Sequence, residues 1–230
     1  MKIYQDYYDE FKPQWMFPSK SEERLLKYIT DKDLDCLHVG LSTGWFWELI
    51  SAKMNLNRKI IGTTIDKKGL EFSENLFRQN WVSDQIEIKL EDVTTVGIYE
   101  NNQFDIVYAR LVLHYISKYE IQKTVDELYR ITKEWWKLLV VVKSVNNAWK
   151  HTTYDDKAGL HISTYYDAKG DITWVGKRYY HSEETIRNTL ESSWFTVSSI
   201  ESYDEKLCKD YSRTLPSPVL DSVIEVICHT

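Results

Sequence analysis

LDCLHVGLSTGWFWELISAKMNLNRKIIGTTID, residues 34–66, is the stretch of the chain that decides the fold. An apolar run at 35–39 enters a loop that contains Gly40 and Gly44, an amphipathic helical pattern follows, and a second apolar run occupies 59–65. Strand, glycine loop, helix and strand in this order form the first half of a doubly wound sheet, whose ligand site lies at the strand ends. Glycine lets the loop backbone turn sharply and approach a ligand. The helix N-terminus behind the loop offers unpaired N–H groups to an anion.

The alternation of strand and helix continues as far as residue 143, and a last helix and two strands follow later. Helices are expected at 20–30, 44–54, 66–80, 121–131 and 182–190, and strands at 35–39, 59–65, 86–90, 104–109, 137–143, 195–200 and 219–228. The FDIVYA strand at 104–109 is apolar enough to be buried on both faces, as in a parallel sheet. The predicted fold class is α/β: a doubly wound, mostly parallel seven-stranded sheet with helices on both faces and an antiparallel hairpin at one edge.

The length of 230 residues predicts a single domain. Residues 1–33 are a helical lead-in to the sheet, and 144–181 form a polar, tyrosine-rich insertion with a hairpin signal at 167–171. Two interpretations of the insertion stay open, because alternating aromatic and polar residues fit either a substrate lid or an ordinary exposed hairpin. The residues that a lid would use are Tyr165, Tyr166, Arg178, Tyr179, Tyr180 and His181.

Composition and charge exclude several classes of protein. The net charge of −6 argues against a nucleic-acid partner, because there is no excess of Lys and Arg to neutralise phosphates. Three cysteines are an odd number and lack the spacing of metal ligands, which favours a reduced, cytoplasmic setting. We expect neither a signal peptide nor a membrane span, and nothing resembles a Ser-His-Asp triad, a phosphate-binding P-loop or a metal cluster.

Several segments together resemble the class I S-adenosylmethionine-dependent methyltransferases over roughly residues 20–228. They are HVGLSTG at 38–44, LEDV at 90–93, FDIVYARLVLHYIS at 104–117, EIQKTVDELYRITKEWWKLLVVVKS at 120–144 and SEETIRNTLESSWFTV at 182–197. The most specific is the FDxV strand, followed by a loop ending in a His-Tyr pair, a helix, a turn and an apolar strand. The resemblance implies S-adenosylmethionine as the cofactor.

The resemblance also implies which residues would hold the cofactor. The methionine half would lie above Gly40, Leu41, Ser42 and Gly44, with Ala109 and Arg110 lining its side, and His38 occupies the place of an acid late in strand one. The ribose would be held by Thr64 or Asp66. The adenine amino group would donate a hydrogen bond to Asp92, and Val93 would lie against the ring. For Asp66 an N-cap of the following helix is favoured over ribose binding, and for His38 a histidine satisfied at a strand end is favoured over a catalytic base.

Three of these positions depart from the family pattern. His38 replaces an acid, Ser42 replaces the middle glycine of the loop, and Thr64 replaces the ribose-binding acid. A threonine hydroxyl makes only neutral hydrogen bonds, so we expect the cofactor affinity to fall by about 1–2 kcal/mol if nothing compensates.

The candidate catalytic residues are His114 and Tyr115, which follow the fourth strand and face the expected acceptor site. Histidine is the natural general base near neutral pH. The same pair could instead anchor the following helix. Glu201, Glu205 and Arg213 are interpreted as a solvent-exposed face.

The function predicted from the resemblance is methyl transfer to a small or medium-sized molecule, because the insertion is aromatic rather than basic. One alternative is a binding protein that keeps the fold but has lost catalysis. Another is an RNA ribose methyltransferase, which would need a Lys-Asp-Lys-Glu set; Lys143 and Glu225 could serve in part, but Ala109 and Arg110 stand where an Asp is expected. A nicotinamide-dependent reductase would need GxGxxG, which is absent. The oligomeric state is not predicted.

The chain has nine tryptophans and only eight glycines. Several of these tryptophans fall where the family or the local turn favours glycine: Trp45, Trp81, Trp135, Trp136 and Trp194. One hypothesis is that the source organism decodes UGA as glycine, whereas the present sequence was translated with UGA as tryptophan. Glycine would give GLSTGGFG at 40–47 and KEGGKLLVVVKS at 133–144. The other hypothesis is that the tryptophans are genuine and mark a decayed cofactor site.

Overall fold

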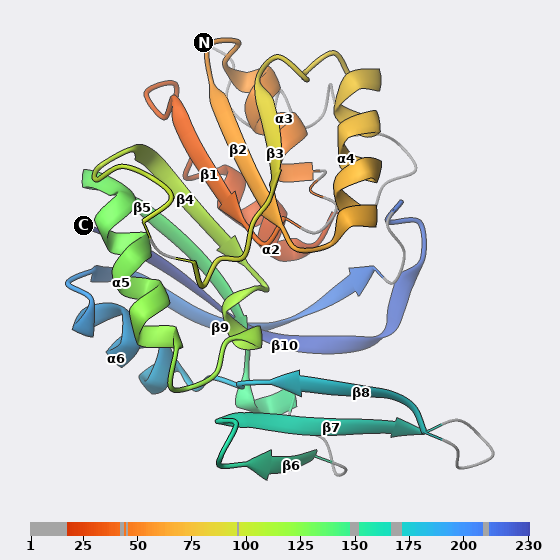
Figure 1. The fold of residues 1–230 in the computed structure, drawn as a ribbon. Coiled ribbons are helices and arrows are strands. Elements are labelled where there is room, and N and C mark those ends of the chain that lie inside the picture. Colours follow the sequence, from red (N-terminus) through yellow and green to blue (C-terminus); the bar gives the residue numbers. More distant parts are fainter. Residues whose placement is uncertain are drawn as a thin grey trace.

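The computed structural model describes residues 18–41, 44, 46–95, 97–147, 152–166, 172–208 and 212–230. A seven-stranded sheet has the spatial order β3-β2-β1-β4-β5-β10-β9 (Figure 1). Its strands are β1 (Asp35–Val39), β2 (Lys59–Thr64), β3 (Ile86–Leu90), β4 (Phe104–Arg110), β5 (Thr132–Lys143), β9 (Thr196–Cys208) and β10 (Pro216–His229). The first five pair in parallel, whereas β10 is antiparallel to both β5 and β9. The predicted fold class is confirmed.

Helices cover both faces of this sheet (Figure 1). One face packs against α2 (Lys20–Leu26), α3 (Phe46–Met54) and α4 (Lys67–Gln79), and the other against α5 (Ile121–Ile131) and α6 (Glu183–Ser192). Alternate residues of β4 therefore enter two separate cores: Ile106 and Tyr108 pack on the first face, Val107 and Ala109 on the second, and all four are fully buried. Burial on both sides explains why the FDIVYA segment shows no polar alternation.

Helix starts follow the local chemistry of the sequence. Asp66 is the N-cap of α4, and its side chain accepts a hydrogen bond from the Lys68 N–H. Ser182 caps α6 in the same way through the Thr185 N–H. These contacts satisfy N–H groups that the first helical turn leaves without partners.

The insertion after β5 forms a second, three-stranded antiparallel sheet of β6 (Thr152–Asp155), β7 (Leu160–Tyr166) and β8 (Ile172–Arg178). The predicted turn at 167–171 lies outside the described residues, although β7 and β8 pair as that hairpin requires. This sheet attaches to the segment after β4, because the Tyr179 N–H donates to the His114 carbonyl oxygen (2.7 Å) and the Lys118 N–H to the Gly159 carbonyl oxygen (3.2 Å).

Arg178 and Tyr179, two of the six residues expected to form a lid, are partly buried. Tyr180 and His181 are buried where the insertion joins the main sheet, so they anchor the insertion. The side chains of Tyr165 and Tyr166 lie outside the described part of the chain. Among the described residues, none from the insertion lines the cleft discussed below, and the lid stays a prediction.

Candidate functional site

A cleft of about 620 Å³ opens at the carboxyl ends of the central parallel strands. Its walls come from the segments that follow β1, β2, β3 and β4, and from the 3₁₀ turn η1 (Leu113–Tyr115). Ser19, Arg213 and the end of β9 complete the cleft on its other side. Parallel sheets of this kind bind ligands at these strand ends, where the strand order reverses on either side of β1 and β4.

The turn after β1 shapes the floor of the cleft. Gly40 has φ +71°, and a β-carbon there would lie 2.5 Å from Cβ of Val112. Glycine is therefore required both by the backbone conformation and by the approach of Val112. The Leu41 N–H donates to the Thr63 carbonyl oxygen (2.7 Å), which ties the turn to β2. Ser42 lies outside the described residues, and Gly44 packs beneath the Leu41 side chain instead of lining the cleft.

The end of β2 brings a hydroxyl, an apolar side chain and a carboxylate to the cleft. Thr64 is buried, and its hydroxyl oxygen accepts the Asp66 N–H (3.0 Å). Asp66 lines the cleft while it caps α4, so the capping role is confirmed. Its ribose-binding role stays a prediction. Ile65 lies between them, 76% exposed, and offers an apolar wall.

The end of β3 supplies two more carboxylates. Glu91 accepts a hydrogen bond from the Tyr99 hydroxyl (2.6 Å). Asp92 accepts from the Thr94 N–H (2.9 Å) and the Thr94 hydroxyl (2.8 Å), so a local turn fixes its orientation. Val93 is partly buried beside it. We call this part of the cleft, formed by Gly40, Leu41, 64–66 and 91–93, the loop side.

The opposite part of the cleft contains a buried network of ion pairs. Ala109 is buried in the core and does not line the cleft, but Arg110 does. The Arg110 guanidinium donates to the hydroxyl oxygens of Ser21 (Nε, 2.8 Å) and Ser19 (Nη2, 2.6 Å). It also lies 3.5 Å from Oε1 of Glu205, measured from Nη2.

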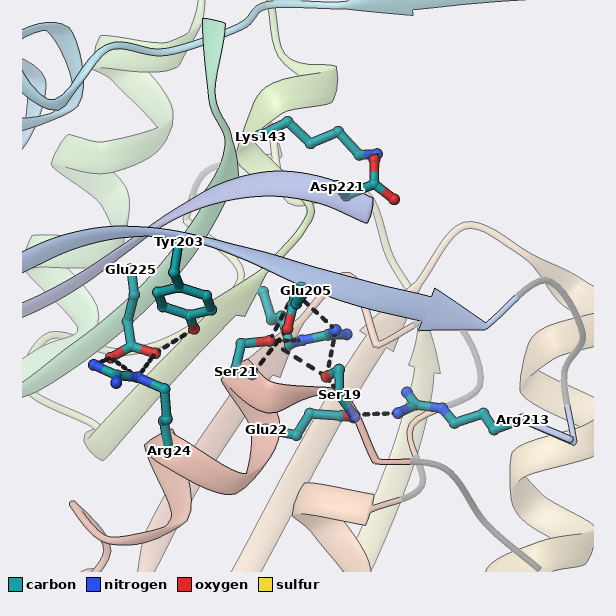
Figure 2. Close-up of polar contacts among 11 residues, drawn as sticks. Ser19, Ser21, Glu22, Arg24, Lys143, Tyr203, Glu205, Arg213, Asp221 and Glu225 are labelled. Atoms are coloured by element: carbon teal, nitrogen blue, oxygen red, sulfur yellow. Dashed lines mark hydrogen bonds and ion pairs between the residues drawn. The ribbon is translucent and has the colours of Figure 1, made fainter. Parts of the chain in front are cut away.

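Two further residues complete this network, and they correct the sequence interpretation of a solvent-exposed face. Glu205 is 2% exposed and accepts both the N–H (2.9 Å) and the hydroxyl (3.0 Å) of Ser21. Arg213 lines the cleft and pairs with Glu22 of α2 (Figure 2). Only Glu201 behaves as expected, with its side chain 54% exposed. We call Ser19, Ser21, Glu22, Arg110, Glu205 and Arg213 the ion-pair side.

The charges of the ion-pair side stabilise one another. Burial alone would raise the pKa of Glu22, but Arg213 and Arg110 lower it to about 2. Burial would likewise lower the pKa of Arg110, and the carboxylates of Glu22 and Glu205 outweigh that effect and raise it. Glu22 and Arg110 therefore stay charged at neutral pH, within a network that brings together two guanidinium groups and two carboxylates.

His38 lines the cleft, and contacts with the protein interior fix its ring. Its Nδ1 pairs with the carboxylate of Glu48 on α3, and both side chains are buried. The ring of Tyr108 packs against His38 at 4.4 Å between centroids, and Trp47 stacks on Tyr108 at 4.7 Å. This arrangement matches a histidine satisfied at a strand end.

The comparisons with known proteins agree with this geometry. Residues 37–135 match a family model described as a methyltransferase domain. A SAM-dependent methyltransferase from Methanosarcina mazei has a similar structure, with a TM-score of 0.69 at 14% identity over 90% of this chain and 96% of that one. The chain has the fold of the class I S-adenosylmethionine-dependent methyltransferases, and part of it matches the methyltransferase-domain model.

Other structures with this fold include enzymes of different chemistry. An S-adenosylmethionine-dependent methyltransferase from Mesorhizobium loti matches with a TM-score of 0.61 at 15% identity, over 91% of this chain and 98% of that one. The [4+2]-cyclase SpnF matches with a TM-score of 0.60 at 17% identity, over 90% of this chain and 78% of that one. The search of curated proteins found no match. Function must therefore be argued from the site.

The two candidate catalytic residues have different surroundings. Tyr115 lines the cleft and is 55% exposed. His114 is fully buried, and neither of its ring nitrogens has a hydrogen-bond partner among the described residues. Burial and the positive charges of Lys143 and Arg178 lower the pKa of His114. A catalytic role of either residue stays a prediction, and the structure places only Tyr115 at the cleft.

The residues required by an RNA ribose methyltransferase are not brought together. Lys143 pairs with Asp221, whereas Glu225 accepts hydrogen bonds from Arg24 and from the Tyr203 hydroxyl (Figure 2). Neither Lys143 nor Glu225 lines the cleft.

Sequence reasoning missed several cleft residues. Ile65 and Glu91 stand directly beside residues that were singled out, so the position after each strand end was a usable signal. Ser19 and Arg213 gave no such signal, because they reach the cleft only through the folding of α2 and of the segment that joins β9 to β10.

None of the helices in the described part of the chain has the length and apolarity needed to cross a membrane.

Proposed function

We propose that this protein binds S-adenosylmethionine in the cleft and transfers its methyl group to a small or medium-sized acceptor. The observation that carries the proposal is the composition of the loop side. The left-handed Gly40 turn, the apolar side chains of Ile65 and Val93, and the carboxylates of Asp66, Glu91 and Asp92 all line one cleft.

These donors and surfaces fit the chemistry of the cofactor. Carboxylates make strong hydrogen bonds to ribose hydroxyls and to an exocyclic amine. The apolar side chains of Ile65 and Val93 beside them suit the faces of an adenine ring. Asp66 and Asp92 already accept hydrogen bonds from their own helix or turn, so their orientations are set before a ligand arrives. This preorganisation compensates in part for the threonine at position 64.

The ion-pair side suits the amino-acid end of the cofactor and the acceptor. Arg110 and Arg213 place guanidinium groups at the cleft, where they can meet a carboxylate. Because Glu22 and Glu205 balance them, this side carries little net charge and does not favour a polyanion. A medium-sized organic acceptor that reaches Tyr115 fits these surroundings better than a nucleic acid does.

When bound, the cofactor supplies an activated methyl group on a sulfonium. The residues of this chain would then orient the two reactants in line and exclude water, and that alignment is a sufficient source of catalysis for a displacement of this kind. Tyr115 is the cleft residue best placed to orient an acceptor hydroxyl or amine. The buried His114 would influence Tyr115 only indirectly, through the η1 turn that contains both residues.

A binding protein without transferase activity is the second candidate. It is supported by Thr64, which replaces the ribose-binding acid and whose hydroxyl oxygen already accepts the Asp66 N–H. The experiment has two arms: calorimetric titration with S-adenosylmethionine, and incubation with methyl-labelled cofactor and phenol, amine and carboxylate acceptors. Binding with label transfer supports the methyltransferase, and binding without transfer to any acceptor supports the second candidate. Absence of binding at millimolar cofactor contradicts the methyltransferase and supports the second candidate, in which the cofactor site has decayed.

A further inference from the structure

Three tryptophans have a backbone conformation that favours glycine. Trp81, Trp135 and Trp194 have φ values of 60°, 68° and 70°. In this left-handed region the β-carbon of an L-residue crowds the backbone. Among the described residues, six non-glycine positions have positive φ and three of them are tryptophan, although only nine of the 230 residues are tryptophan.

Trp81 ends α4 in a hydrogen-bonding pattern that is typical of glycine. The helix is followed by its C-cap Asn80, and Trp81 is the next residue. The Trp81 N–H donates to the Arg78 carbonyl oxygen (3.2 Å), and the Val82 N–H donates to the Phe77 carbonyl oxygen (3.1 Å). These two bonds define the Schellman motif, in which the left-handed residue is usually glycine.

Trp194 ends α6 with the same two bonds. It follows the C-cap Ser193. Its N–H donates to the Glu191 carbonyl oxygen (3.1 Å), and the Phe195 N–H donates to the Leu190 carbonyl oxygen (3.2 Å). Two helices that are far apart in the sequence thus end in one motif, and both carry tryptophan at its glycine position.

Trp135 occupies the left-handed position of a third turn, between α5 and the paired part of β5. The register of β4 with β5 shifts there, because Phe104 pairs with Thr132 but Ile106 pairs with Lys137. β5 has three more residues than β4 across this irregularity, which contains Trp135, and the left-handed conformation there favours glycine.

The indole side chains do not explain why tryptophan stands at these positions. Trp81 is 90% exposed, and Trp135 and Trp194 are each 80% exposed. An exposed side chain gains little from the hydrophobic effect, so it cannot offset the backbone strain.

We infer that the native residue at positions 81, 135 and 194 is glycine, encoded by UGA codons that the source organism reads as glycine. UGA differs from the tryptophan codon UGG only in its third base, and some genetic codes read it as tryptophan. One codon assignment thus accounts for three independent turns. The inference does not depend on the proposed function.

The same codon at positions 45 and 47 would change the surroundings of the cofactor loop. Trp47 is fully buried, and its Nε1 has no hydrogen-bond partner among the described residues. It lies beside His38 and Tyr108, with ring centroids 6.0 Å and 4.7 Å away. Glycine at 47 would open space next to His38, at the edge of the cleft.

The direct test is peptide mass spectrometry of the protein isolated from its source. Trypsin releases residue 81 in the peptide 79–89 and residue 194 in the peptide 188–206. We expect the masses of glycine-containing peptides at both sites. Tryptophan in either peptide would overturn the inference.

Engineered variants test the physical basis separately. Trp81→Gly and Trp194→Gly should each raise the melting temperature by about 3 °C or more, because the backbone strain is removed. Trp81→Ala and Trp194→Ala are the matched controls, since alanine also removes the indole but keeps the β-carbon; we expect less than half of the gain. A glycine variant that melts at or below the temperature of its alanine control would contradict the strain argument. Trp136→Gly should give no gain, because position 136 is not left-handed.

Discussion

The two sides of the cleft are built in different ways. The loop side consists of residues that follow single strands and are oriented by their sequence neighbours: Asp66 by the Lys68 N–H and Asp92 by Thr94. The ion-pair side joins residues from distant segments: Ser21 and Glu205 are 184 positions apart and Arg213 and Glu22 are 191 apart. The loop side therefore depends on local backbone geometry, and the ion-pair side depends on the complete fold.

The largest expected effect comes from breaking the ion-pair side. Glu205→Ala leaves the buried Arg110 without its closest carboxylate and removes two hydrogen bonds to Ser21. We expect the free energy of unfolding to fall by about 3–5 kcal/mol, measured by urea denaturation at pH 7. Glu201→Gln on the same strand is the control, because its pair with Arg24 is largely exposed; it should cost less than about 1 kcal/mol. An equal loss of unfolding free energy in the two variants would show that the buried network stabilises the fold no more than an exposed ion pair does.

Acid should weaken the fold where the insertion joins the main sheet, at His181. Burial lowers the pKa of His181 from 6.5 to about 4. The unfolded chain therefore binds a proton more readily between these values, and stability falls as the pH drops from about 6.5 to 4, by up to about 3 kcal/mol. His181→Phe should flatten this part of the stability–pH curve. Thermal denaturation of the variant and of the unmodified protein at a series of pH values measures the curve. An unchanged slope in the variant would contradict the assignment.

A second acid transition should follow at lower pH. Glu22 has its pKa lowered to about 2, so its contribution is complete above its ordinary value of 4.5 and is lost as the pH falls toward 2. Its transition thus lies below most of the histidine transition. His181→Phe should leave this lower transition in place, and its disappearance in that variant would mean that the two groups titrate together.

The loop side should break through its backbone. Gly40→Ala adds a β-carbon to a residue with φ +71° that Val112 contacts closely. We expect a loss of about 1–3 kcal/mol in stability from the strained backbone alone, with weaker cofactor binding in addition. Gly97→Ala is the matched control, because Gly97 has φ +77° and an added β-carbon there would have no atom within 4 Å. It should lose stability but bind S-adenosylmethionine normally, whereas normal binding by Gly40→Ala would remove the turn from the site.

The smallest effect sharpens the role of a single charge. Asp92→Asn keeps an oxygen that can accept the Thr94 N–H and removes only the negative charge. Cofactor affinity should fall by about 1–1.5 kcal/mol, roughly tenfold, with unchanged stability. Titration calorimetry measures it, and an unchanged dissociation constant would exclude Asp92 from the contact.

The same contrast explains what the sequence could predict. Gly40, Asp66 and Asp92 could be predicted to lie at the ligand site from the sequence, because a turn, a helix cap and a strand end have signatures within a few neighbouring residues. Glu205 and Arg213 were misassigned as solvent-exposed, because their burial comes from α2 packing against β9 and β10. Periodicity gave the order of strands and helices, since burial on both faces leaves a clear apolar pattern. The buried state of His114 depended on the insertion sheet, which the sequence placed only as a segment.

The most direct test of the whole account is calorimetric titration of the protein with S-adenosylmethionine at pH 7. We predict saturable binding at one site per chain, with a dissociation constant below about 1 mM, and competition by S-adenosylhomocysteine. No heat of binding at millimolar cofactor would contradict the account and leave the fold without the proposed activity.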